Sequence, residues 1–362
     1  MHLHPMIELS NDREVRQAKG FKDAAAGLTG EELARLYETE LANAPRRTAV
    51  GKKFLVKAKP PTSRRAHKDE EHLSLALLKH CRDSGEGLAL PSVGNLDLLA
   101  AQVPLATASV DRSMGDADPN KGVGKIDLIG VGPEDRLVVV KLKFAAPGAT
   151  RGGTGDTPLR AFLDGLAQTA IASANREALA SELAAAQERT LSDEPPIFAL
   201  VASPRYWELC RKREAQKGAA WIREIERLAH GTEESIGVQV LYLAVALEGD
   251  PGWEYGEEGP VLAAAPQLTA AWEARAGVVK PKAKPRSKAQ TAAVEMIVEA
   301  DLSRPVRAYL LTESYDAGDR ISHPTLGTGV VQGSAGVGKV RVLFDDKKAL
   351  LVHQRPVPSS AS

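Results

Sequence analysis

The sequence predicts an α/β protein in which a mixed helix-and-strand domain precedes a small all-β domain. Residues 70–203 contain, in order, a helix pattern, three strand patterns, a second helix pattern and another strand pattern. Residues 278–290 are rich in Lys and Pro, which hold a chain extended and mark a linker. Residues 315–356 then show four short strand patterns, as expected for a small barrel. A chain of 362 residues is long for one domain, so a division is expected.

The first 69 residues are expected to form a helical and basic N-terminal extension. A helix is predicted over residues 29–41, with Glu31 and Glu32 near its positive end. Residues 46–68 contain nine Lys or Arg residues and no acid. This charge run fits a solvated basic arm, and it equally fits a segment that contacts the phosphates of a nucleic acid.

The main domain is expected over residues 70–275, starting with a helix over residues 70–81. Leu73, Leu77 and Leu78 lie on one face of that helix. Three strands follow, and a Gly-Pro-Glu-Asp turn joins the last two as a hairpin. The predicted strand bounds are 96–105, 125–131 and 136–144.

The second half of this domain begins with a glycine-rich loop over residues 148–155. A helix follows, with Asp156 or Thr157 as its N-cap and Pro158 in its first turn. The remaining predicted elements are a strand at 197–202, a helix at 219–230 and a strand at 238–246.

The C-terminal part is expected to consist of a linker with a short helix, residues 276–314, and a barrel, residues 315–362. The barrel strands are predicted at 320–323, 329–332, 339–344 and 349–353. Residues 333–339 fit the pattern G-x-x-x-x-G-K, but Val340 stands where a phosphate-binding loop needs Ser or Thr. The run that starts there predicts a strand instead of a helix, so we expect no nucleotide at residues 333–339.

Composition restricts the partners and the compartment. Lys plus Arg and Asp plus Glu both number 47, so any nucleic-acid-binding surface has to be local. Cys81 and Cys210 are far apart and outside any C-x-x-C spacing, which excludes a disulfide framework and a cysteine-based zinc site. The N-terminus lacks the features of a signal peptide, and no stretch approaches the roughly 18 apolar residues that cross a bilayer. We therefore expect a cytoplasmic protein with no membrane contact.

Asp127, Lys141 and Lys143 form the most informative group. They fall on the two strands of the predicted hairpin, where residues two apart share a face, so both lysines can meet Asp127. A carboxylate and a lysine that converge on one sheet edge suit metal-assisted hydrolysis, because the acid holds the cation and the lysine, here Lys143, positions the attacking water or stabilises developing phosphoryl charge. The alternative is an amphipathic hairpin with solvated lysines.

Together, this group of residues and the order of predicted elements over residues 70–203 resemble the core of the PD-(D/E)XK nuclease superfamily. The resemblance implies a restriction-endonuclease-like core, hydrolysis of phosphodiester bonds in DNA, and Mg²⁺ or Mn²⁺ as cofactor. Asp127 matches the family's Asp and Lys143 its Lys, but Lys141 stands where the family has Glu or Asp. An ammonium group there repels a metal by about 1–4 kcal/mol.

Three explanations of Lys141 remain open. It is natural and the protein binds nucleic acid without cutting; an acid elsewhere, Glu70 or Glu71, has taken the role; or it is an inactivating change. Asp127 and Glu70 are the expected metal ligands. The predicted function is a metal-dependent DNA nuclease impaired by Lys141, and the alternative is a non-catalytic nucleic-acid-binding adaptor.

Further DNA contacts are predicted around this group. A glycine-rich loop that leads into a helix can accept a phosphate, although flexible connection is the commoner role. The candidates are Arg64, Arg65 and Lys68 in the basic run, Arg151 in the glycine-rich loop, and Arg160 and Gln168 on the helix after it.

The segment from Gly318 to Val331 carries a second resemblance. Its Gly318-Asp319 pair, its His323-Pro324 pair and its closely spaced glycines resemble the Tudor-like module of CarD-type transcription regulators and of UvrD-type helicases. The resemblance implies an SH3-like or Tudor-like barrel that docks a protein partner, such as transcription or repair machinery.

Overall fold

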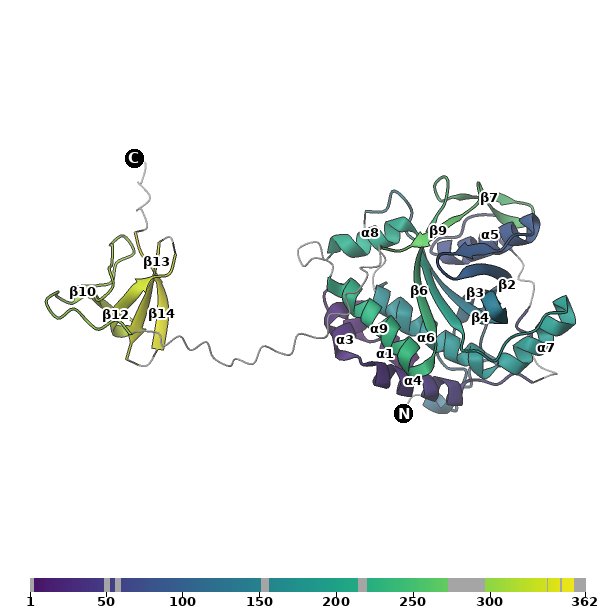
Figure 1. Ribbon diagram of the computed structural model, residues 1–362, viewed down its shortest axis with the longest axis horizontal. Coiled ribbons are helices and arrows are strands. Elements are labelled where there is room, and N and C mark those ends of the chain that lie inside the picture. The colour runs from purple at the N-terminus through teal and green to yellow at the C-terminus, as the bar shows by residue number, and fades with distance from the viewer. Residues whose placement is uncertain are drawn as a thin grey trace. The chain divides into compact units, whose positions relative to one another are not determined.

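The chain divides into two compact units, Met1–Val279 and Lys280–Ser362 (Figure 1). The structure is a computed structural model. It describes residues 3–48, 53–55, 60–150, 156–213, 220–272, 297–336, 338–345 and 347–354. The linker predicted at 278–290 lies outside the described residues.

A seven-stranded mixed sheet forms the centre of the first unit. Its strand order is β1-β2-β3-β4-β5-β6-β9. Strands β1 to β4 are antiparallel neighbours, β4, β5 and β6 run parallel, and β9 is antiparallel to β6. The bounds are β1 Leu88–Leu90, β2 Gly94–Pro104, β3 Lys125–Val131, β4 Leu137–Lys143, β5 Ile197–Ala202, β6 Gln239–Ala246 and β9 Gln267–Ala270. The predicted mixed α/β class is confirmed.

Helices cover both faces of this sheet (Figure 1). Strand β5 is wholly apolar and β4 is apolar apart from Lys141 and Lys143, as strands buried on two faces are, and alternate apolar residues of β4 enter two separate cores. Val139 of β4 packs in the core shared with α6 and the N-terminal helices, whereas Val138 and Val140 pack in the core shared with α5. The helices are α1 Pro5–Ser10, α2 Arg13–Arg16, α3 Phe21–Gly27, α4 Gly30–Asn43, α5 Asp69–Ser84, α6 Pro158–Ala174, α7 Arg176–Gln187, α8 Pro204–Arg213 and α9 Ala220–Ile236.

The N-terminal helices belong to the first unit's core, which differs from the extension expected over residues 1–69. Met6, Phe21 and Leu33 are buried in the same core as α6. Burial of these side chains removes apolar surface from water, and that joins α1, α3 and α4 to the domain. The helix predicted at 29–41 is α4, capped by Thr29, whose hydroxyl accepts from the Glu32 amide.

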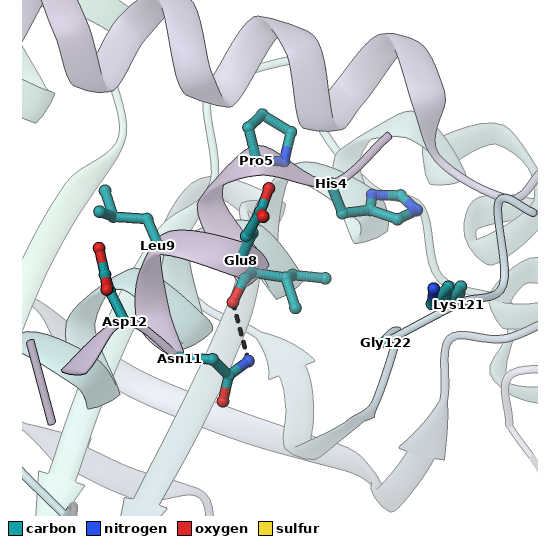
Figure 2. A pocket seen from close by; sticks show the side chains of 9 residues that line it. His4, Pro5, Glu8, Leu9, Asn11, Asp12, Lys121 and Gly122 are labelled. Carbon is teal, nitrogen blue, oxygen red and sulfur yellow. Dashed lines mark hydrogen bonds between the residues drawn. The ribbon is translucent and has the colours of Figure 1, made fainter. Parts of the chain in front are cut away.

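A surface pocket lies beside α1 (Figure 2). Residues of α1 and Lys121 and Gly122 from a distant loop line it. Asn11 donates from its side-chain amide to the Ile7 carbonyl at 2.9 Å and so closes the end of α1. The pocket contains none of the residues predicted for catalysis.

The elements around the predicted site match their expected bounds closely. Strand β3 and strand β5 have the predicted ends, and the predicted helix at 70–81 continues to Ser84, where Gly85 adopts a φ of +71° and ends it. The cap of α6 is Thr157, one of the two expected candidates. Cys81 and Cys210 are both buried, and neither forms a disulfide.

Several elements of the first unit were not predicted. Helix α7 has a weak apolar stripe with Leu179 and Leu183 as its buried residues. Strands β7 Trp253–Gly256 and β8 Gly259–Leu262 form a two-stranded hairpin, and Trp253 and Leu262 join the core beside α5. Their stability comes from packing on that core, which short periodic patterns do not reveal.

The second unit is a five-stranded sheet in the order β10-β11-β12-β13-β14. The strands are β10 Arg307–Ala308, β11 Arg320–His323, β12 Gly327–Ser334, β13 Lys339–Phe344 and β14 Lys347–Val352. Ile321, Val331 and Val342 are fully buried in its core. Gly329 is required by close packing, because a Cβ atom there would lie 2.6 Å from the Phe344 ring. The strand expected from Val340 onward is part of β13.

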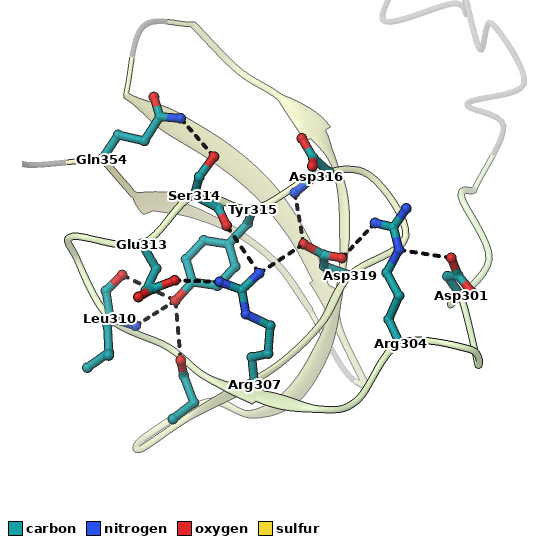
Figure 3. Close-up of polar contacts among 11 residues, drawn as sticks. Asp301, Arg304, Arg307, Leu310, Glu313, Ser314, Tyr315, Asp316, Asp319 and Gln354 are labelled. Carbon is teal, nitrogen blue, oxygen red and sulfur yellow. Dashed lines mark hydrogen bonds and ion pairs between the residues drawn. The ribbon is translucent and has the colours of Figure 1, made fainter.

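Residues 297–314, expected in the linker with a short helix, instead carry β10 and no helix. An ion-pair network holds this segment against the sheet (Figure 3). Arg304 donates to Asp319 at 2.8 Å, and Arg307 lies over the Tyr315 ring with its guanidinium carbon 5.0 Å from the centroid. The segment therefore belongs to the second unit.

Candidate functional site

The predicted group converges at one place in the first unit. Asp127 on β3 and Lys141 and Lys143 on β4 lie on neighbouring antiparallel strands, and Glu70 stands on α5. The register places Leu128 opposite Val140, which brings Asp127 beside the lysines. The Leu142 amide donates to Asp127 Oδ2 at 2.8 Å and orients the carboxylate toward β4.

Lys141 lies between two carboxylates. Its Nζ is 2.6 Å from Asp164 Oδ2 and 3.8 Å from Asp127 Oδ2. Burial lowers the pKa of Lys141, but the carboxylates of Asp127 and Asp164 outweigh this and leave the pKa above its ordinary value. Lys141 is therefore a charged ammonium group at neutral pH.

Lys143 has its own pair of carboxylates. Its Nζ is 2.8 Å from Asp156 Oδ1 and 3.5 Å from Glu70 Oε1. Burial lowers the pKa of Lys143, and the carboxylates of Asp156 and Glu70 reverse this and raise it well above the ordinary value. Burial raises the pKa of Glu70, against the opposing effect of Lys143.

Sequence reasoning did not identify Asp156 and Asp164 as members of the site. The sequence pattern predicts Asp156 only as a helix cap, but Thr157 caps α6 and the Asp156 carboxylate pairs with Lys143. Asp164 lies four residues after Arg160 and four before Gln168. Residues four apart share a helix face, so the spacing that places Arg160 and Gln168 on one face also places Asp164 there.

The other predicted residues are distributed unevenly. Gln168 is buried beside the group, and its Nε2 donates to Asp164 Oδ2 at 3.4 Å. Glu71 instead pairs with Lys68 at 3.2 Å, so the structure does not bring it to the lysines of β4. Arg64 binds Asp69 at the start of α5, and Arg65 is exposed nearby.

Two further DNA contacts were predicted at Arg160 and Arg151. Arg160 Nη2 donates to Asn11 Oδ1 at 3.4 Å, toward α1. Arg151 lies outside the described residues.

The residues present do not fit a divalent cation. Mg²⁺ and Mn²⁺ need several oxygen ligands that converge on one point. Among the described residues, no group of three or more His, Cys, Asp or Glu side chains is placed to hold a metal ion. The carboxylates of the group instead pair with the ammonium groups of Lys141 and Lys143.

Comparison of the chain with protein-family models, with curated proteins and with solved structures finds no match. In the part of the chain that the structure describes, no helix has both the length and the apolar character needed to cross a membrane.

Proposed function

We propose that the first unit is the scaffold of a metal-dependent DNA nuclease whose hydrolysis of phosphodiester bonds is impaired by Lys141. The observation that carries the proposal is the convergence of Glu70, Asp127, Lys141 and Lys143 from α5, β3 and β4. The order of elements supports it as well. Strands β2, β3 and β4, preceded by the short β1, are antiparallel and follow α5, and β5 returns parallel to β4 after α6, which agrees with the element order that the resemblance implies.

The impairment follows from charge. An acid at position 141 would stand beside Asp127 and supply oxygen ligands, whereas Lys141 supplies a cation. Because these residues do not fit a metal, no step through a metal is available to the chain as it is. Loss of a supporting ligand costs about 3–4 kcal/mol of transition-state stabilisation, or roughly a 10²–10³-fold lower rate.

DNA as the substrate is supported by charges near the site. Arg64, Arg65 and Lys68 are exposed and directly precede α5, the helix that carries Glu70. Basic side chains in such a place supply the salt-dependent part of nucleic-acid binding. Two of them have acidic neighbours, Asp69 and Glu71, in exposed pairs that cost little to open.

For the second unit, we propose a Tudor-like barrel that docks a protein partner. The proposal is supported by two hydrogen bonds that join the end of β14 to the segment after β10, at the two edges of the sheet. The Tyr309 hydroxyl donates to the Val352 carbonyl at 2.6 Å, and the Gln354 amide donates to the Glu313 carbonyl at 3.0 Å.

The test is cleavage of plasmid and linear DNA by the full chain and by Lys141→Glu, with Mg²⁺, Mn²⁺ or EDTA. We expect Lys141→Glu to cut at least about 10²-fold faster than the unchanged chain, only with metal. Asp127→Ala in the Lys141→Glu background should abolish this activity. Lys121→Glu is the matched control, because Lys121 forms an exposed ion pair with Asp116 and neither residue belongs to the group.

The second candidate is a nucleic-acid-binding adaptor without catalysis. The complete pairing of Lys141 and Lys143 with carboxylates favours it, because a site neutralised by its own side chains needs no metal. Binding of labelled DNA, measured by fluorescence anisotropy in EDTA, separates the two. Tight binding with no cleavage even by folded Lys141→Glu would establish the adaptor and refute the nuclease.

A further inference from the structure

We infer that the ammonium group of Lys141 is the resident cation of this carboxylate cluster, with Asp164 as its dedicated partner. It takes the position that a divalent cation would otherwise fill, so the unchanged chain keeps the cluster together without metal. The inference deepens the proposed function and rests on it, because it takes position 141 to be the place of a metal-binding acid in an active nuclease.

The ion-pair distances support this role. The contact of Lys141 with Asp164 is the shorter one, at 2.6 Å, and Asp127 completes the pair of acids around it at 3.8 Å. Lys141 and Asp127 are only 12% and 14% exposed, so solvent screens their interaction weakly. Removal of the ammonium would leave two carboxylates facing one half-buried space.

The packing of helix α6 against the sheet places Asp164 beside Lys141. Gly165, the next residue, lies against β4 and β5: a Cβ atom there would be 2.2 Å from the Phe198 ring and 3.3 Å from Lys141 Cβ. Only a glycine allows so close an approach. The close packing of α6 on the sheet therefore places Asp164 beside Lys141. The contact does not depend on the rotamer of a loosely held surface side chain.

Oxygen ligands for a cation remain at the position once the ammonium is removed. Asp127 and Asp164 face it, and Gln168 Oε1 is buried with no hydrogen-bond partner in the described part of the chain. An unpaired buried acceptor is costly, and a cation or its water would satisfy it. Lys141 also has a carboxylate partner on another element, Asp164 of α6. A site adapted to lysine is expected to contain such a partner. This favours the explanation that Lys141 is natural over the explanation that it is an inactivating change.

The experiment measures Mn²⁺ binding by the EDTA-treated full chain without nucleic acid. Electron paramagnetic resonance of free Mn²⁺ gives binding directly, and thermal melting with and without Mn²⁺ gives a second readout. We expect Lys141→Glu to bind Mn²⁺ at least about ten-fold more tightly than the unchanged chain, and its melting temperature to rise with Mn²⁺. The melting temperature of the unchanged chain should not respond.

Lys141→Met is the second variant, because it removes the ammonium without adding a third acid and so places less negative charge in the cluster than Lys141→Glu does. Lys121→Glu, at an exposed pair, is the control and should behave as the unchanged chain. Mn²⁺ binding by the unchanged chain as tight as by Lys141→Glu would overturn the inference, and so would folded variants that bind none. Mn²⁺ binding without DNA cleavage would leave this inference standing and refute the nuclease.

Discussion

At the scale of single residues, His4 shows how a buried charge holds the N-terminal helices. Its Nδ1 lies 2.6 Å from Glu40 Oε2 and its Nε2 lies 2.8 Å from the Pro119 carbonyl. Both ring nitrogens face acceptors, so the imidazolium form satisfies both. Glu40 in turn accepts from the amides of Met6 and Ile7 at the start of α1. One ion pair therefore joins α1 to α4.

This pair predicts a pH dependence of stability. Burial lowers the pKa of His4, but Glu40 and the Pro119 carbonyl reverse this, so the folded-state pKa is above the unfolded value of about 6.5. The stabilisation is fully present below pH 6.5 and is lost as the pH rises through the folded pKa. Urea denaturation from pH 6 to 9 should show this loss. His4→Gln should remove about 3 kcal/mol at pH 6 and flatten the profile; an unchanged slope would contradict the assignment.

Asp164 provides a second prediction at this scale. Asp164→Asn leaves Lys141 with Asp127 alone, and we expect a loss of about 1–3 kcal/mol, toward the lower end because Asp164 is a third exposed. Asp23→Asn, which opens an exposed pair with Lys22, should cost less than about 0.5 kcal/mol. Denaturant titration measures both. A double-mutant cycle of Lys141→Met with Asp164→Asn should show coupling, and additivity would exclude a direct pair.

At the scale of elements, the packing of α6 on β5 decides the geometry of the site. Gly165 lets the helix approach Phe198, and the same approach sets Asp164 on Lys141. Helix and strand are both predictable from their patterns, but their separation depends on this one residue. Periodicity says which face of α6 is apolar and does not say how near the sheet it lies.

Gly165→Ala tests this packing. The added methyl group would overlap the Phe198 ring, so we expect a loss of about 1–3 kcal/mol in spite of alanine's better helix propensity. Gly27→Ala is the matched control, because no atom lies within 4 Å of a Cβ at the end of α3. Denaturant titration should show Gly165→Ala to be less stable than the unchanged chain and Gly27→Ala to be at least as stable as it. Equal stabilities would show that α6 has room to shift.

At the scale of the whole molecule, the two compact units are expected to respond separately to change. All four tryptophans, Trp207, Trp221, Trp253 and Trp272, belong to the first unit. Tryptophan fluorescence therefore reports on the first unit alone, whereas amide signals in NMR spectra report on both.

Asp319→Asn should affect only the second unit. Burial raises the pKa of Asp319, but its bonds to Arg304 and the Asp316 amide outweigh this and lower the pKa, so the carboxylate stabilises the fold above its unfolded pKa of about 3.9. That stabilisation is lost as the pH falls through the folded pKa. At neutral pH we expect the variant's β11–β14 amides to lose protection while the tryptophan transition stays in place. A shift of the tryptophan transition would contradict independent units.

The sequence by itself determined the regular elements with strong patterns and the meeting of Asp127 with Lys141, whereas the ion pairs of Lys143 are with Asp156 and Glu70. Hairpin pairing is local, so the register of β3 and β4 follows from the strands and the turn between them. The weak pattern of α7 and the short strands β7 and β8 were missed, because packing on the core stabilises them.

Only the tertiary structure decided which acids meet the lysines. Asp156 and Asp164 reach β4 because α6 crosses back over the sheet, and Glu71, a neighbour of Glu70 in sequence, turns to Lys68 instead. Contacts between distant segments depend on how closely a helix lies on a sheet and on its rotation about its own axis. Neither quantity is encoded in a local pattern, so the sequence predicted the lysines of the site and the fold supplied their partners.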